Sequence, residues 1–109
     1  MSEKLYQLEY YLTEDGKCPF TDWLNGMRDR MTEARIRTRL DRVSLGNFGV
    51  VKAVSDGVCE LKMDFRPGYR VYYAMSGKTA VLLLVGGDKS TQQKDIETAK
   101  GFWADYRTR

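Results

Sequence analysis

Three strand-like segments in the second half of the chain follow one another with only short turns between them, and this pattern constrains the fold most. Residues 58–66 alternate between apolar and polar side chains, as expected for a strand with one buried face. Pro67-Gly68 is a strong turn signal, and residues 69–75 predict the next strand. Ser76-Gly77-Lys78 then leads into residues 79–85, which are apolar on both faces. We therefore expect antiparallel pairing, with this last strand in the centre of a sheet that is covered on both sides.

The remaining segments predict helices and strands around these three strands. Ile36, Leu40 and Val43 recur at helical spacing in one segment, and Pro19 marks the start of another helix. The predicted elements are a strand over residues 5–12, helices over 19–27 and 32–45, a short strand over 50–54 and a final helix that begins near Ser90. This order predicts the α+β class, with an antiparallel sheet, two N-terminal helices and a C-terminal helix packed on it. No linker interrupts residues 1–109, which we expect to form a single domain.

The charge and the titratable residues narrow the chemistry that the chain can perform. A net charge of +3 suits a nucleic acid or an acidic protein as partner without selecting either. The chain has two cysteines, Cys18 and Cys59, and no histidine, which argues against a structural zinc site and leaves acid–base chemistry to Lys, Asp, Glu, Tyr or Arg. We expect a cytoplasmic protein without membrane contact, because no signal-like segment precedes the first strand and the longest apolar run, residues 79–85, is far too short to span a bilayer.

A polar face shared by two neighbouring strands is the first candidate site. It consists of Glu60, Lys62, Asp64, Arg66, Arg70 and Tyr72. A two-residue turn would pair Phe65 with Arg70 and set the arginine among apolar neighbours. A longer loop or a bulge would pair Arg66 with Arg70 and put all the charges on one face, and we favour this register because it avoids the desolvation of an arginine. A solvated outer face that serves only solubility is the alternative interpretation.

Two further features have both a functional and a purely structural interpretation. The segment Gly86-Gly87-Asp88-Lys89-Ser90 lies between a strand and the start of a helix, where free backbone N–H groups favour an anion, but the same residues would also suit a tight turn. An arginine stripe on the second predicted helix could bind RNA phosphates or an acidic partner segment, or could simply be solvated. The stripe consists of Arg28, Arg35, Arg39 and Arg42.

Four motifs, taken in their order and spacing, resemble one known family. They are Gly46-Asn47-Phe48-Gly49, residues 57–62 (GVCELK), residues 67–72 (PGYRVY), and Gly86-Gly87-Asp88-Lys89-Ser90 with Gln92, Asp95, Ile96 and Ala99. The family is the HigB-like "addiction module killer" branch of the RelE/ParE toxin superfamily, and the resemblance covers nearly the whole chain. It implies a RelE-like fold and the role of toxin in a type II toxin–antitoxin pair. The implied partner is a helix-turn-helix antitoxin of the HigA type.

The resemblance also implies an activity. RelE-type members inhibit translation by cleaving mRNA on the ribosome without a metal or another cofactor, in a reaction in which the 2′-hydroxyl attacks the neighbouring phosphate and leaves a cyclic phosphate. Carried onto this sequence, the catalytic residues are Lys62, Arg70 and Lys89, and the RNA-binding residues are Asp64, Arg66, Tyr72 and Lys94. Arg70 and Lys89 keep the residue type of the family. Lys62 stands where the family usually has arginine, and Arg66 stands where it commonly has glycine. An exposed Tyr72 would stack on a base.

The residues leave the proton transfers and the function class open. Lys62 and Asp64 are both candidates for the general base, and a lysine, an arginine or a tyrosine would be the acid. A ParE-like poison of DNA gyrase that cuts no RNA is the alternative function, and a toxin that has lost its activity and only binds its antitoxin is a third. The basic residues between Glu60 and Arg70 favour the nuclease, because gyrase poisoning requires no phosphate-cleaving face.

Overall fold

A computed structural model of the chain describes residues 3–109, which form a five-stranded sheet with helices on both of its faces. The elements are β1 (Gln7–Tyr10), α1 (Pro19–Asn25), α2 (Arg30–Ser44), β2 (Val51–Ser55), β3 (Val58–Lys62), β4 (Arg70–Met75), β5 (Ala80–Gly87), a 3₁₀ turn (Lys89–Thr91) and α3 (Gln92–Thr108). Among these residues, no helix has both the length and the apolar character needed to cross a membrane.

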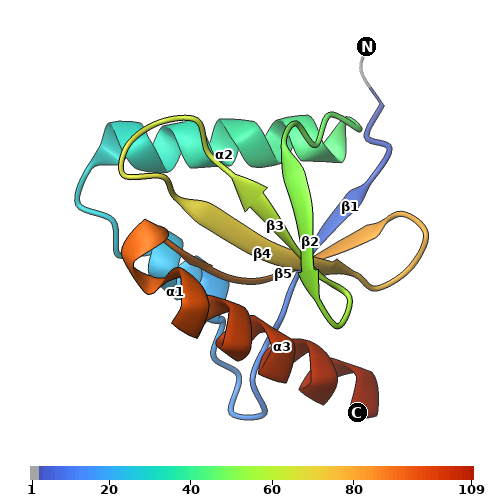
Figure 1. Cartoon of the computed structure of the whole chain (residues 1–109). Coiled ribbons are helices and arrows are strands. Elements are labelled where there is room, and N and C mark those ends of the chain that lie inside the picture. The colour runs from blue at the N-terminus through green and yellow to red at the C-terminus, as the bar shows by residue number, and fades with distance from the viewer. Residues whose placement is uncertain (1–2) are drawn as a thin grey trace.

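The strands lie in the order β1-β5-β4-β3-β2, and α2 and α3 lie on opposite faces of the sheet (Figure 1). The predicted α+β class and the antiparallel pairing from β2 to β5 are confirmed. The sheet as a whole is mixed, however, because β1 pairs with β5 in parallel. Short turns determine the relative direction only of the strands that they join. The direction of β1 was not determined in this way, because β1 connects to the rest of the sheet through α1 and α2.

Each face of the sheet buries its own hydrophobic cluster. Phe20 of α1 and Ile36 of α2 pack with Val71 and Leu83 on one face, whereas Ala99 of α3 packs with residues such as Leu82 on the other. β5 contributes to both clusters and is buried over most of its length, as predicted for a central strand. Burial of a large apolar side chain contributes about 1.5–3 kcal/mol, so the two clusters together hold the helices on the sheet.

The first strand is shorter than the predicted segment, residues 5–12. Tyr10 and Leu12, which alternation puts on the same face of that segment as Tyr6 and Leu8, are 45% and 49% exposed. Tyr11 is buried instead, stacked on Phe102 of α3 with ring centroids 4.6 Å apart, and its hydroxyl donates to Asp105 over 2.6 Å. The chain leaves the sheet after Tyr10 and passes to the α3 side, so the two-residue period does not continue beyond the strand.

The connection between β3 and β4 differs most from the prediction. β3 ends at Lys62, which pairs with Arg70, so both registers considered from the sequence are wrong and residues 63–69 form a loop. The backbone N–H of Met63 donates to the carbonyl of Tyr69 over 2.9 Å at the base of this loop. The alternation that extended the predicted strand has another cause: Met63 packs in the cluster under α2, and Phe65 lies partly buried beside it. Asp64 and Arg66 are consequently exposed loop residues.

Candidate functional site

A hollow of about 550 Å³ opens between the β3–β4 loop and the segment that follows β5. Its lining contains five of the seven residues predicted to act on RNA. These five are Lys62, Asp64, Arg66, Arg70 and Lys89. The hollow therefore brings together residues that are up to 27 positions apart in the sequence.

The ends of three neighbouring strands place the three predicted catalytic residues. Lys62 is the last residue of β3 and lies opposite Arg70, the first residue of β4. Arg70 in turn pairs with Gly87, the last residue of β5, and Lys89 follows two residues later in the 3₁₀ turn. Since β4 is antiparallel to both of its neighbours, its start and their ends meet at the same edge of the sheet.

Arg70 is held in a buried polar network rather than on an open face. Its side chain is only 6% exposed, and its Nη1 donates to the carbonyl of Gly68 over 2.6 Å. Its Nε lies 3.5 Å from Oε1 of Glu60, which is 5% exposed, but the two atoms do not form a hydrogen bond. Nη2 makes no hydrogen bond with any residue from 3 to 109, and Arg70 contributes to the lining of the hollow.

Glu60 links this network to the start of α3. Its Oε1 accepts hydrogen bonds from Nε2 of Gln92 over 2.8 Å and from the hydroxyl of Tyr72 over 3.3 Å. Gln92 is the first residue of α3, so the helix covers the polar face at this end of the sheet. The expectation that Arg70 avoids desolvation, on which the favoured register rested, is therefore wrong.

Tyr72 does not have the exposure that stacking on a base would require. Its side chain is completely buried in the cluster under α3, which contradicts the predicted role as an exposed stacking residue. Burial, followed by the nearby charge of Glu60, raises the pKa of its phenol well above the usual value. Tyr72 instead donates a hydrogen bond to Glu60 and helps to hold that carboxylate in place.

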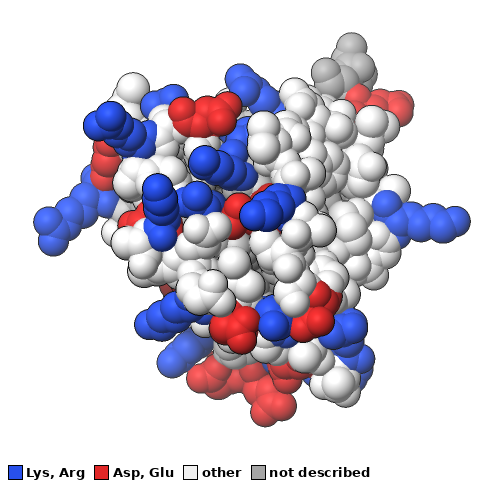
Figure 2. All heavy atoms as spheres, in the orientation of Figure 1, with Lys and Arg blue, Asp and Glu red and all other residues white. Residues whose placement is uncertain are grey.

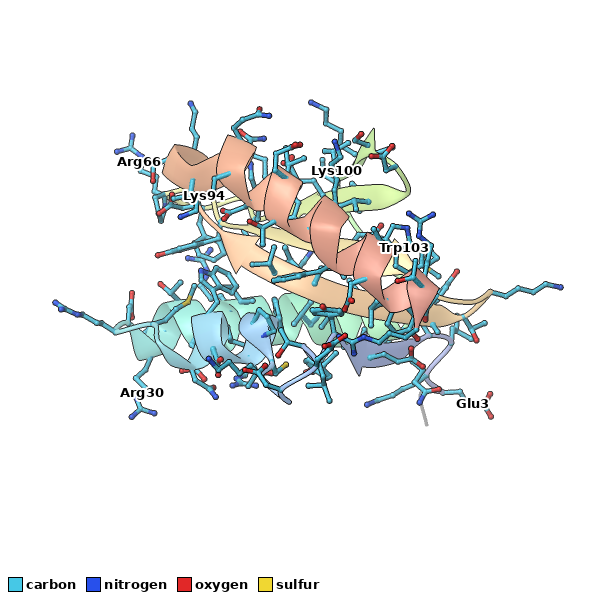
Figure 3. The ribbon with its side chains drawn as sticks, turned by 90° about the horizontal axis from the view of Figure 1, so that it is seen from below. Glu3, Arg30, Arg66, Lys94, Lys100 and Trp103 are labelled. Atoms are coloured by element: carbon cyan, nitrogen blue, oxygen red, sulfur yellow. The ribbon has the colours of Figure 1, made fainter. Side chains whose placement is uncertain are left out.

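Arg66 and Lys94 lie at the same end of the molecule, the end at which α3 begins (Figure 3). Arg66 lines the hollow from the β3–β4 loop, whereas Lys94 is an exposed residue of α3 outside the lining. Among residues 3–109, neither forms an ion pair with a carboxylate, and the same is true of Lys62 and Lys89. In the region that the structure describes, these four cations are thus not held in ion pairs, and Asp64 is the one carboxylate residue in the lining of the hollow.

The segment after β5 forms a turn in which the carboxylate of Asp88 accepts the hydrogen bonds that a bound anion would otherwise accept. Asp88 accepts hydrogen bonds from the backbone N–H of Ser90 over 2.8 Å and from its hydroxyl. These bonds, the hydroxyl bond first, hold the pKa of Asp88 below its usual value. The N–H group of Ser90 is therefore not free for a phosphate, which favours the structural interpretation of this segment. Lys89 projects from it as an exposed side chain.

The two glycines of this segment allow α1 and α3 to pack closely against the end of β5. A Cβ atom at Gly86 would overlap the ring of Trp23, and one at Gly87 would overlap the carboxylate of Asp95. Burial raises the pKa of Asp95 despite its hydrogen bond to Thr91. Asp95 of α3 can approach the end of β5 closely because position 87 has no side chain.

The sequence placed Glu60 on the polar face and Gln92 in a motif, but neither residue was assigned a catalytic or RNA-binding role. Glu60 could have been predicted to lie near Arg70, because both residues are on the same face of two adjacent strands. No local pattern indicated Gln92, because its contact with Glu60 spans 32 residues. Among residues 3–109, no group of three or more His, Cys, Asp or Glu side chains lies close enough to hold a metal ion. The residues present can bind and stabilise an anionic group with their own cations.

Comparisons with known proteins relate most of the chain, including this hollow, to one family. The family model described as "Phage derived protein Gp49-like (DUF891)" matches residues 22–102. A protein of Haemophilus influenzae, described as an uncharacterized protein, is 47% identical to the chain over 81 residues. The alignment covers 74% of this chain and 82% of that relative.

Proposed function

Because the chain belongs to the Gp49-like family of phage-derived proteins, a family of toxins from toxin–antitoxin systems that is related to the RelE-like fold, we propose that it is a toxin that cleaves mRNA on the ribosome. The family implies an antitoxin as partner. Within this proposal, the antitoxin is of the helix-turn-helix, HigA-like kind and the chain is a HigB-like toxin.

The observation that carries the proposal is the meeting of Lys62, Arg70 and Lys89 in one hollow at the ends of three strands. Arg66 adds a fourth cation from the loop. Cleavage of a phosphodiester builds negative charge on the phosphoryl oxygens in the transition state, and preorganised cations stabilise that charge best where water is partly excluded. Figure 2 shows that Lys and Arg side chains also gather on the face formed by α2 and the β3–β4 loop, which favours the approach of a polyanion.

The proposed reaction needs only the chain's own residues. The 2′-oxygen of one nucleotide attacks the adjacent phosphorus, the bond from phosphorus to the 5′-oxygen of the next nucleotide breaks, and a 2′,3′-cyclic phosphate and a 5′-hydroxyl remain. The proton of the 2′-hydroxyl passes to the general base, Lys62 or Asp64, and the leaving oxygen takes a proton from the general acid, a role that we propose for Lys89 because it lines the same hollow. Nη2 of Arg70 would bind a phosphoryl oxygen.

The test is to express the chain in bacteria with and without the antitoxin and to map the new RNA ends. We expect growth arrest that the antitoxin relieves, and cleaved mRNA whose downstream fragments carry 5′-hydroxyl ends. Lys62→Ala and Lys89→Ala should each slow cleavage about a hundredfold, whereas Lys78→Ala, an exposed lysine in the β4–β5 turn, is the matched control.

Growth arrest with intact mRNA would refute the nuclease proposal. If gyrase-dependent DNA breaks accompanied that arrest, the ParE-like alternative would explain it. Normal growth at confirmed expression of folded protein would contradict the toxin role itself.

A further inference from the structure

A second hollow, of about 510 Å³, lies between α2 and the β3–β4 loop. Met63, Asp64 and Phe65 line both this hollow and the first one, so the two are neighbours on either side of the same loop segment. The helix contributes Arg35 and Arg42 to the lining. The second hollow therefore continues the cationic surface beyond the residues proposed for catalysis.

Arg39 also borders this hollow, but the fold uses its guanidinium. Its Nη1 donates to the carbonyl of Lys62 and its Nη2 to the carbonyl of Phe48, each over 2.9 Å. These two bonds attach the end of β3 and the segment before β2 to α2, and the arginine is not free for a ligand.

Arg35 and Arg42 differ from Arg39 because neither of their guanidinium groups is bonded to the backbone of the described residues. The guanidinium carbon of Arg35 lies over the ring of Phe65, 3.8 Å from the ring centroid. Neither Arg35 nor Arg42 forms an ion pair with a carboxylate in the described part of the chain. One face of the Arg35 guanidinium is thus stacked on an aromatic ring while its charge has no carboxylate partner.

Unpaired cations beside apolar side chains match the chemistry of single-stranded RNA. A base stacks on aromatic rings and on arginine planes, and its phosphate takes the positive charge. A hollow of this size accommodates one nucleotide, and Met63 and Val50 add apolar lining to it. Because the wall of the hollow is shared with the proposed catalytic hollow, a strand with its scissile phosphate near Arg70 can reach Arg35 within a nucleotide or two.

We propose that the hollow bounded by Arg35, Arg42 and Phe65 binds a nucleotide that flanks the scissile phosphate, with its base against Arg35 and its phosphate near Arg42. This proposal rests on the proposed nuclease function and extends it to the path of the RNA strand. It makes Arg35 a determinant of the preferred base at one position beside the cut. An acidic segment of a protein partner is the competing occupant, and the shared wall with the proposed catalytic hollow favours RNA.

The test uses the purified full chain, intact ribosomes and a pool of mRNAs that are randomised at the nucleotides flanking one cleavage site. Arg35→Ala should raise KM about tenfold with little change in kcat, because a lost base stack weakens binding rather than the chemical step. It should also flatten the base preference at one flanking position. Arg35→Lys should keep most of the affinity but lose the preference, since lysine keeps the charge without the planar stacking surface.

Arg37→Ala is the matched control. Arg37 lies on the same helix, and its guanidinium is bonded to Glu33 and Asn25 instead of lining the hollow. Circular dichroism of all three variants establishes that they are folded.

The outcomes separate the two proposals. If the wild-type chain cleaves RNA while Arg35→Ala cleaves it with unchanged KM and preference, the subsite proposal fails and the nuclease proposal stands. If Arg35→Ala retains cleavage but no longer binds the antitoxin, the hollow is a protein interface and the subsite proposal is overturned. If the wild-type chain cleaves no RNA under the same conditions, both proposals fail.

Discussion

The buried pair of Arg70 and Glu60 makes a quantitative prediction about folding. At 3.5 Å between Nε and Oε1, two unit charges attract by about 5 kcal/mol at an effective dielectric constant of about 20. Arg70→Ala removes this attraction and leaves the carboxylate of Glu60, 5% exposed, without a cation. Gln92 and Tyr72 still donate to Glu60, and water can enter the space left by the arginine. We therefore expect the free energy of unfolding to fall by about 3 kcal/mol, the low end of values for broken buried pairs.

A second substitution distinguishes this cause from a general loss of packing. Glu60→Gln removes the stranded charge and keeps a side-chain oxygen that can accept from Gln92. The double variant should therefore be more stable than Arg70→Ala alone, by about 2 kcal/mol. Urea unfolding followed by circular dichroism measures both differences. A loss below about 1 kcal/mol for Arg70→Ala, or a double variant that is less stable still, would refute the reasoning.

The same pair of variants also decides what Arg70 does in the reaction. Arg70→Ala alone is ambiguous, since a destabilised protein loses activity whatever the role of the residue. If the double variant is folded and still cleaves RNA a hundred- to a thousandfold more slowly, roughly the loss of one transition-state donor, Arg70 acts on the phosphate. A folded double variant that cleaves as fast as the wild type would show that its role is structural.

Two further predictions concern buried tyrosines on both faces of the sheet and a glycine that lies beneath α3. Burial first, and the hydrogen bond to Asp105 second, raise the pKa of Tyr11 to about 12, and burial raises the pKa of Tyr73 to about 12. Since tyrosines of the unfolded chain release their protons near pH 10, the free energy of unfolding should decline as the pH rises from about 10 to 12. Urea midpoints of the wild type that stay level over this range would contradict the prediction, as would a Tyr11→Phe variant with an equally steep decline. Gly87→Ala should displace the start of α3 because its Cβ would overlap Asp95, and we expect the melting temperature to fall by several degrees. Gly101→Ala is the control, because a Cβ there meets no atom within 4 Å, and it should leave the melting temperature unchanged or raise it. Equal melting temperatures for the two variants would show that Asp95 moves aside at little cost in stability.

The sequence predicted those parts of the fold whose signals are local. β3, β4 and β5 follow one another through a loop and a turn without an intervening helix, so their order and antiparallel pairing could be predicted from alternation and turn residues. The direction of β1 could not be predicted this way, because two helices and three strands separate it along the chain from β5, its neighbour in the sheet. The length of β3 was overestimated because Met63 and Phe65 continue its period while packing beneath α2.

The sequence predicted which residues form the candidate site but not how deeply several of them are buried. Lys62 and Arg70 share a face because both have even numbers on directly paired strands, and Lys89 follows from the adjacent strand end. The burial of Arg70, Tyr72 and Glu60 depends on α3, which returns to cover these strands after 20 or more residues. A long-range contact of this kind leaves no trace in the periodicity of either segment.

The clamp formed by Arg39 limits how this chain can diverge. Its two hydrogen bonds need two nitrogens held in a fixed fork, so a lysine at position 39 would preserve the charge but could not reach both carbonyls. The same guanidinium occupies the space where a side chain at Gly49 would begin, and Gly49 has a backbone φ of +67° that favours glycine. In a set of homologous sequences, positions 39 and 49 should therefore be retained together or replaced together. Lineages that have lost the pair would have to anchor the backbone of Lys62 by some other means.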